Sequence, residues 1–360
     1  MSRVGLRALA PQVAAGAAGL AVGGLGGLLF SRIGTPLPWL LGPLVFVAAA
    51  NLSGWRIGAF AGGREFGLAT IGTAVGLYFT PAVAALVVLH LPTILVAAFL
   101  PILIGAMCAT VLARIGRLDP LTAYFASVPG GMSEMVELGL RLGARPVEIM
   151  IAQIVRVTMV VMIVPAALAL FGASGVEVAA KPAAIALDLP RLAVLLAANL
   201  ALAWALTRAG LTNAWLLGPI ALTGVLTYLE VHLSAMPGAL STAAQLVLGV
   251  CLGQRFRRES FTRSPRVVLG AFVSTLILLV LCALLAVALG ALTGLPVASM
   301  IAATAPGGLA EMSITAKVLG LGVPLVIAFH VTRLFMITLA AMPVYRALQY
   351  LRGRRTAIGE

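Results

Sequence analysis

The chain has 360 residues, of which 61% are hydrophobic and 10% are charged, and its mean hydropathy is +1.11. This composition leaves too little polar surface to cover a soluble globule of 36.9 kDa, so it excludes the soluble classes of protein. The net charge of +13 does not indicate nucleic-acid binding, because most of the 24 basic residues fall in short connections between apolar segments, where topology signals lie.

Ten apolar segments are each about as long as a membrane span, which takes roughly 20 helical residues. In chain order they are residues 12–30, 36–52, 66–89, 92–113, 147–171, 190–207, 213–231, 239–254, 267–292 and 323–345. The first segment has no convincing small-residue cleavage site, so we interpret it as a retained helix. We expect an all-α polytopic membrane protein with about ten transmembrane helices.

Two motifs occur once in each half of the chain. Trp39-Leu-Leu-Gly-Pro43 returns in the second half as Trp215-Leu-Leu-Gly-Pro219. The string Ser-Val-Pro-Gly-Gly-Met-Ser-Glu-Met, which begins at Ser127, returns as Thr-Ala-Pro-Gly-Gly-Leu-Ala-Glu-Met, which begins at Thr304. We therefore predict a first membrane repeat over residues 1–175, a second over 176–350 and a short cytoplasmic tail over 351–360.

Residues 119–145 and 296–321 decide the topology. If each segment enters and leaves the membrane on one side, each half has an odd number of spans and the second half is inverted relative to the first. With a cytoplasmic N-terminus, eighteen of the 24 basic residues then face the cytoplasm and four face outside, whereas full crossing places twelve inside and ten outside. The charges therefore predict two re-entrant hairpins, an inverted-topology internal repeat and two cytoplasmic termini.

A proline and two glycines interrupt each predicted hairpin. Pro129 cannot donate a backbone hydrogen bond, and Gly130 and Gly131 allow a flexible turn. The corresponding residues of the second hairpin are Pro306, Gly307 and Gly308. Such a break is tolerated in a membrane only inside protein or beside water. A proline-kinked continuous helix is the alternative, but a kink would not require the glutamate that follows both copies.

These paired Pro-Gly-Gly and Trp-Leu-Leu-Gly-Pro motifs resemble those of the AbrB-type bacterial inner-membrane proteins, whose halves are described as the AbrB duplication. The resemblance covers nearly the whole chain, from about residue 12 to residue 346. It implies a multi-pass protein of the bacterial inner (cytoplasmic) membrane. Members of this family have been labelled ammonia monooxygenases, regulators of gene expression and transporters. The soluble transition-state regulator that shares the name is a small β-rich DNA-binding protein, and nothing in this chain is similar to it.

The monooxygenase label does not fit the residues of this chain. A copper or iron oxygenase needs clustered imidazole, carboxylate or thiolate ligands, but the three histidines are scattered and the three cysteines stand singly in apolar stretches. No Walker motif is present to bind ATP. We therefore expect neither an enzyme nor a cofactor or metal site.

Charged residues inside the membrane are the strongest functional signal. Glu134 and Glu311 follow the two breaks and could cap exposed helix amides, or each could bind a coupling cation or carry a proton. Arg156 and Arg333 lie deep in the last span of each half. They could neutralise the glutamates as two ion pairs, or their guanidinium groups and the helix N-termini could form an anion site.

Polar residues beside these charges complete the candidate site. Gln153 and His330 each precede an arginine by three positions and share its helical face, and His330 alone could titrate near neutral pH. Hydroxyl groups at Ser127 and Thr304 could bind an ion or satisfy the backbone. The candidate substrate- or ion-binding residues are Ser127, Pro129, Gly130, Gly131, Glu134, Gln153, Arg156, Thr304, Pro306, Gly307, Gly308, Glu311, His330 and Arg333.

The function that this pattern favours is secondary transport of a small polar solute, with an organic anion as the candidate class, coupled to a Na⁺ or H⁺ gradient. One hairpin-bearing module would move against a scaffold formed by the first spans of each half. The expected partners are the lipid bilayer and the solute, without nucleic acid, and the sequence leaves a homo-oligomer open. One alternative is a membrane-embedded regulator or sensor of gene expression, and another is a channel-like facilitator, whose uptake would ignore ion gradients.

Overall fold

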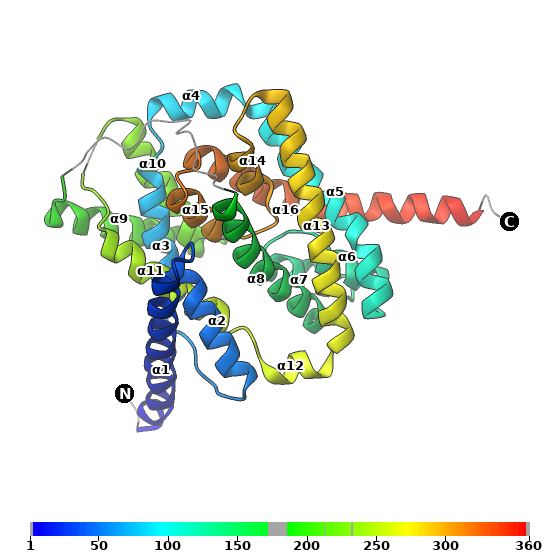
Figure 1. The fold of residues 1–360 in the computed structure, drawn as a ribbon, viewed down its shortest axis with the longest axis horizontal. Coiled ribbons are helices and arrows are strands. Elements are labelled where there is room, and N and C mark those ends of the chain that lie inside the picture. Colours follow the sequence, from blue (N-terminus) through cyan, green and yellow to red (C-terminus); the bar gives the residue numbers. More distant parts are fainter. Residues whose placement is uncertain (1–2, 172–185, 212, 232, 358–360) are drawn as a thin grey trace. The chain divides into compact units, whose positions relative to one another are not determined.

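The computed structural model describes residues 3–171, 186–211, 213–231 and 233–357, and its helices are labelled in Figure 1. Regular structure in these residues consists of sixteen α-helices, with no strand, which confirms the predicted all-α membrane fold. The predicted boundary between repeats, at residues 175 and 176, lies outside the described residues.

The helices divide between two compact units. Unit 1 comprises Met1–Leu89, Pro165–Glu259 and Ser313–Leu325, and unit 2 comprises His90–Val164, Ser260–Met312 and Val326–Glu360. The helices of the first half are α1 (Arg3–Ile33), α2 (Pro38–Leu52), α3 (Gly63–Gly76), α4 (Pro81–Leu89), α5 (Leu91–Gly116), α6 (Pro120–Ser127), α7 (Met132–Arg141) and α8 (Pro146–Leu170). Those of the second half are α9 (Leu189–Arg208), α10 (Ala214–Tyr228), α11 (Gly238–Gly253), α12 (Arg258–Arg263), α13 (Pro265–Thr293), α14 (Val297–Thr304), α15 (Leu309–Val318) and α16 (Val323–Ala357).

Each predicted span corresponds to helix in the structure, but not every span is one long helix. Six helices are long and apolar enough to cross a membrane, while α2, α10 and α11 are apolar but shorter. The predicted span 66–89 is divided into α3 and α4, which meet at 92°. The break falls before Pro81, because the residue that precedes a proline disfavours helical geometry. Helix α16 continues through most of the predicted tail, to Ala357.

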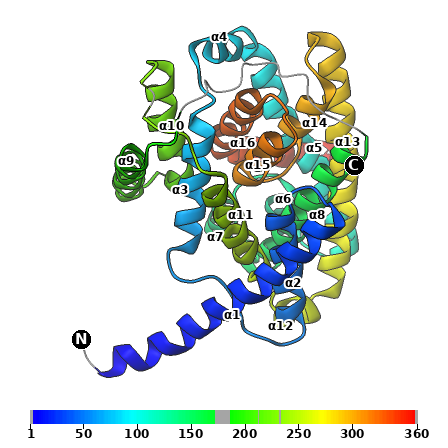
Figure 2. The same ribbon diagram turned by 60° about the vertical axis from the view of Figure 1, so that its left-hand side comes forward.

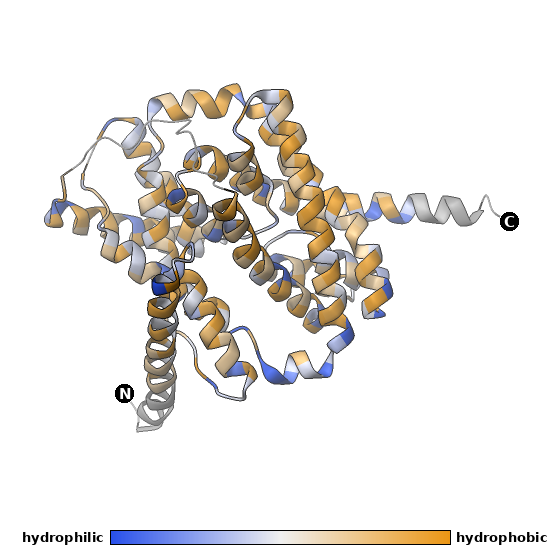
Figure 3. Cartoon of the chain, in the orientation of Figure 1, coloured by the Kyte–Doolittle hydropathy of each residue, from blue (hydrophilic) through white to orange (hydrophobic). Residues whose placement is uncertain are grey.

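Hydrophobic residues run along most of α13, whereas hydrophilic ones gather on the short α12 (Figure 3). Helix α13 packs alongside α5 within unit 2, as Figures 1 and 2 show. The long apolar surfaces of these helices suit contact with lipid. A helix also satisfies its backbone polar groups within the segment, as a lipid environment requires.

The packing of unit 1 displays the internal duplication. A side chain at Gly72 of α3 would collide with Pro219 of α10, and a side chain at Gly249 of α11 would collide with Pro43 of α2. The two glycines hold corresponding positions in the two repeats, and the two prolines do as well. The glycine–proline contact therefore occurs twice, once for each repeat. Each half therefore packs its glycine-bearing helix on the Trp-Leu-Leu-Gly-Pro helix of the other half.

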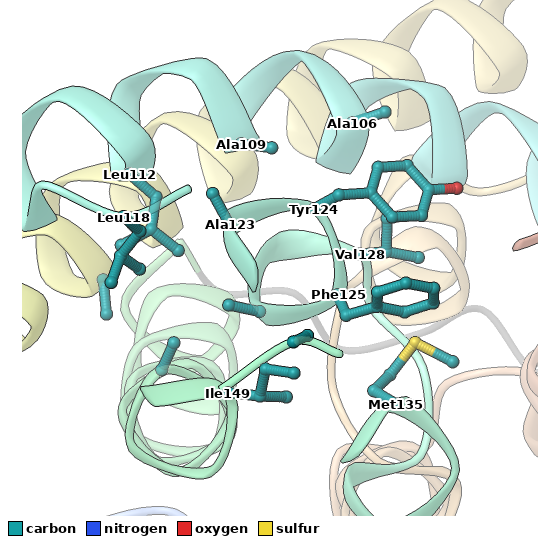
Figure 4. Close-up of a cluster of buried hydrophobic side chains, with 14 of the residues drawn as sticks. Ala106, Ala109, Leu112, Leu118, Ala123, Tyr124, Phe125, Val128, Met135 and Ile149 are labelled. Carbon is teal, nitrogen blue, oxygen red and sulfur yellow. The ribbon is translucent and has the colours of Figure 1, made fainter. Parts of the chain in front are cut away.

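The core of unit 2 surrounds the first Pro-Gly-Gly break. Figure 4 shows Phe125, Val128 and Met135 packed between α5 and the start of α8, where Ile149 lies. The Tyr124 hydroxyl donates a hydrogen bond of 2.7 Å to the carbonyl oxygen of Ala341 on α16. The break is thus held in a packed protein environment, as a helix interruption within a membrane requires.

The two ends of the first hairpin are joined to each other. The Asp119 side chain accepts a hydrogen bond from the Thr122 amide, which caps α6, and one from Arg145 Nε at 3.3 Å. The Arg145 amide donates to Thr122 Oγ1. A segment that crossed a hydrocarbon core of about 30 Å could not bring these ends together. The structure therefore supports the re-entrant reading of residues 119–145.

Candidate functional site

Every candidate substrate- or ion-binding residue lies in unit 2, on the two breaks and on the helices α8 and α16 that face them. In the first break α6 ends at Ser127 and α7 begins at Met132, with Val128 and Gly131 in extended conformations. The carbonyl groups of the break have therefore left the helical hydrogen-bond pattern and need other donors.

Arg156 supplies those donors in the first half. Its Nη1 donates to the carbonyl oxygen of Val128 at 2.9 Å, and its Nη2 donates to that of Gly130 at 3.0 Å. One turn earlier on α8, Gln153 Nε2 donates to the carbonyl oxygen of Phe125 at 2.9 Å. The planar guanidinium thus bridges two carbonyl groups across Pro129, which has no amide hydrogen to offer.

The second break repeats this arrangement atom for atom. Arg333 Nη1 donates to the carbonyl oxygen of Ala305, and Nη2 donates to that of Gly307. His330 Nε2 lies 2.9 Å from the carbonyl oxygen of Ala302. Each of these three carbonyl groups holds the repeat position of its counterpart in the first half, so the arginine clamp is part of the duplicated unit.

The hydrogen bonds of His330 define its protonation. An arginine can only donate, and Arg333 Nη2 lies 2.8 Å from His330 Nδ1, so Nδ1 must accept. The proton of the imidazole is then on Nε2, where it is donated to Ala302. In this arrangement His330 is a neutral hydrogen-bonding group, like Gln153 in the first half.

The two breaks contribute to one electrostatic site. Both guanidinium groups are buried, with 4% of Arg156 and 5% of Arg333 exposed. The Arg156 guanidinium lies within electrostatic range of Arg333 and Glu311, both from the second half. The pairing of Arg156 with Glu134 that the sequence left open is not the arrangement found, because the Arg156 clamp is occupied by carbonyl groups.

The glutamates fold back over the glycines of their breaks. A methyl group at Gly131 would lie 3.1 Å from Glu134 Oε2, and one at Gly308 would overlap the Glu311 carboxylate. Both Glu134 carboxylate oxygens are buried, and neither accepts a hydrogen bond from a described residue. Glu134 therefore does not cap the amides of α7, which leaves its oxygens available for a cation or a proton.

The hydroxyl groups at the ends of α6 and α14 differ. Thr304 Oγ1 donates to the carbonyl oxygens of Met300 and Cys282, so it satisfies the backbone. Ser127 Oγ has no hydrogen-bond partner among the described residues. Sequence reasoning treated the two hydroxyls alike, and it missed the carbonyl acceptors of the arginines, since a carbonyl group leaves no mark on sequence.

No group of three histidine, cysteine, aspartate or glutamate side chains in the described part of the chain could hold a metal ion. The arrangement instead offers buried guanidinium groups, a carboxylate without hydrogen bonds, and the N-termini of α7 and α15, where the helix dipole favours negative charge. These groups can bind and release small charged species.

Comparison with known proteins places the chain in a family. A family model described as "Transition state regulatory protein AbrB" matches residues 39–349. The chain is 26% identical over 362 residues to "Uncharacterized protein YhjN" of Bacillus subtilis (strain 168), which covers 93% of this chain and 94% of the relative. It is 22% identical over 334 residues to "Putative regulator AbrB" of Escherichia coli (strain K12), with 91% and 94% covered. No solved structure matches the chain.

The matched region contains both Pro-Gly-Gly breaks, both arginine clamps and both Trp-Leu-Leu-Gly-Pro helices. This is most of the chain and all of the candidate site. The protein belongs to the AbrB family.

Proposed function

We propose that this protein is a secondary transporter of a small polar solute, with an organic anion as the solute class, driven by a Na⁺ or H⁺ gradient. The observation that carries the proposal is that two buried arginines of unit 2, one from each half, each bind the carbonyl groups of a helix break. Ionisable groups within a membrane are costly and mark the paths of substrates and ions. Interrupted helices in two repeats are the usual way in which secondary transporters build such a path.

The charges favour an anionic solute. Arg156 and Arg333 repel each other and lie behind the breaks, and each break leads into the N-terminus of a helix of ten residues. Backbone amides and the helix dipole at these N-termini add to the positive potential. A carboxylate group between the breaks would relieve the repulsion between the two guanidinium groups.

Glu134 is our candidate for the coupling site. Its buried oxygens accept no hydrogen bond from the described residues, and Arg156, the buried arginine of its own half, is engaged with carbonyl groups. A Na⁺ ion or a proton would neutralise the carboxylate before the binding site switches from one side of the membrane to the other. Neither ion is favoured over the other by the residues around Glu134.

The division of the chain supports a moving-module mechanism. Unit 2 contains both breaks, and unit 1 contains the first three helices of each half, as the predicted scaffold does. We propose, by analogy with other transporters, that unit 2 moves against unit 1 during transport. The proposal includes no enzymatic step, cofactor, metal or nucleic acid.

We propose that the protein lies in the bacterial inner membrane, as its family implies, with both termini in the cytoplasm, as the charge distribution indicates. A homo-oligomer is compatible with this placement. A second candidate function, a membrane-embedded regulator or sensor, is favoured by the name of the Escherichia coli relative. Against it, the connections between spans are too short to form a docking or DNA-reading domain.

A flux assay with purified protein in liposomes distinguishes a transporter from a sensor. A transporter should move the solute without any other component, with saturable kinetics and with accumulation when a Na⁺ or H⁺ gradient is imposed. Glu134→Gln should retain at most exchange or leak. Glu137→Gln is the matched control, because Glu137 is exposed and lies one turn away on the same helix. Binding without flux under either gradient, with a transcriptional response in cells, would favour the sensor.

A further inference from the structure

A small cavity lies behind the first break, between α5, α6, α8 and α13 of unit 2. Its polar lining includes Ser127, Arg156, Ser274 and Thr275, and Ala152 forms part of its wall. The space is comparable with that of a water molecule or a halide ion. We call this space the Ser127 cavity.

Two polar atoms of the lining have no partner. Ser127 Oγ and Arg156 Nε form no hydrogen bond with a described residue, although the two side chains are only 5% and 4% exposed. Arginine Nε can only donate a hydrogen bond, and a serine hydroxyl can also donate. Leaving such buried groups unsatisfied is costly, so the cavity needs an occupant that accepts hydrogen bonds.

Charge selects the class of occupant. Arg156 is the one charged residue among those that line the cavity in the described chain. A cation would be repelled by the guanidinium, and a polyatomic anion such as sulfate is too large for the space. We propose that the Ser127 cavity is a binding site for a small monovalent anion of halide size, with chloride as the physiological occupant.

The second half of the chain lacks this site. Phe329 stands where the first half has Ala152, and it is 1% exposed, so a large ring occupies the place of a methyl group. Ala97 and Ala98 occupy the positions of Ser274 and Thr275. The hydroxyl of Thr304, the counterpart of Ser127, is already satisfied. The polar cavity is therefore a specialisation of the first half, separate from the duplicated arginine clamp.

The proposal does not depend on transport, so binding can be tested in detergent without any flux assay. The melting temperature of the purified protein should be measured at constant ionic strength, with sodium as the cation throughout, while gluconate is replaced by chloride, bromide or sulfate. An anion that binds the folded state raises the melting temperature in a saturable manner. We expect such a rise with chloride and bromide but not with sulfate.

Variants locate the effect. Ala152→Phe reproduces the filled cavity of the second half and should abolish the halide-dependent rise, and Ser127→Ala and Thr275→Val should weaken it. Thr227→Val removes a buried hydroxyl of unit 1 and should leave the rise unchanged. If Ala152→Phe fails to fold, the two hydroxyl variants decide. Equal melting temperatures in chloride and gluconate, or a rise that survives the variants at Ala152, Ser127 and Thr275, would overturn the proposal.

Discussion

The two Pro-Gly-Gly breaks of unit 2 share one arginine clamp but differ in the residues around it. In both, an arginine on the helix that follows the hairpin bridges two carbonyl groups of the break. At the first break, Glu134 accepts no hydrogen bond from the described part of the chain and a polar cavity is present, whereas the second break has Phe329 and a satisfied Thr304. The clamp therefore belongs to the duplicated unit, whereas the groups around it have diverged between the two halves.

The clamp is the shared element, so breaking it should have the largest effect in both halves. A lysine ammonium is a point charge and cannot bridge two carbonyl groups as a guanidinium does. We expect Arg156→Lys and Arg333→Lys each to lower the free energy of unfolding by about 3 kcal/mol or more, because a buried charge loses its partners. Denaturation in detergent checks this.

The control for the arginine variants is Arg141→Lys. Arg141 is exposed and pairs with Glu137 within α7, so its replacement should change stability by less than about 0.5 kcal/mol. If Arg156→Lys or Arg333→Lys were as stable as the wild type, the carbonyl groups of the break would not need the two donors of a guanidinium group.

The glycines before the glutamates should respond unequally. Gly308→Ala places a methyl group on the Glu311 carboxylate, whereas Gly131→Ala makes only a tight contact of 3.1 Å with Glu134. Forced displacement in a packed site costs about 1–3 kcal/mol, so we expect Gly308→Ala to lie in this range and Gly131→Ala below it. Melting temperatures of the two variants check the order. A greater loss in Gly131→Ala would contradict the placement of the carboxylates.

The tie between the ends of the first hairpin should have a smaller effect. Burial acts to raise the pKa of Asp119, but hydrogen bonds from Thr122 and the charge of Arg145 outweigh it and lower the pKa. A lowered pKa stabilises the fold above the unfolded pKa of about 4, and this stabilisation is lost as pH falls through the folded value. Asp119→Ala should cost about 1 kcal/mol at neutral pH, as for loss of a helix cap.

The measurement for the hairpin tie is unfolding of wild type and Asp119→Ala between neutral pH and pH 3. The difference between the proteins should shrink as the carboxyl group of the wild type is protonated. Proline occupies the corresponding position 296, so the second hairpin lacks this tie and offers no equivalent acid sensitivity. A difference that is constant over this pH range would exclude the charge of Asp119 as its cause.

The smallest effect should come from making the halves alike. His330→Gln introduces the residue that serves in the first half, where Gln153 donates to the carbonyl oxygen of Phe125. We expect a change below about 1 kcal/mol and an unaltered pH dependence of transport, since His330 is a neutral hydrogen-bonding group. His330→Leu should cost more, because it removes the donor to the carbonyl oxygen of Ala302 and the nitrogen atom that faces Arg333 Nη2. A pH profile shifted by His330→Gln would show instead that the imidazole titrates.

The sequence predicted the helical class, the duplication, the breaks and the arginines, because each leaves a repeated pattern of residue types. It could not predict the acceptors of the arginines, because the carbonyl groups of Val128 and Gly130 belong to every residue type equally. The division of span 66–89 was also missed, although Pro81 was a visible signal. The difference between Ala152 and Phe329 is visible when the two repeats are aligned. Only the structure shows that Ala152 lines a cavity.

If the two halves form one electrostatic site, Arg156 and Glu311 are energetically coupled, and a double-mutant cycle between them measures that coupling. Arg156→Gln, Glu311→Gln and the double variant should be compared by denaturation in detergent, with Arg156→Gln and Glu137→Gln as the control cycle. The charge of Glu311 acts on Arg156, so we predict a coupling energy of about 1 kcal/mol or more, against additivity within about 0.5 kcal/mol for the control. Additivity in both cycles would contradict a shared site.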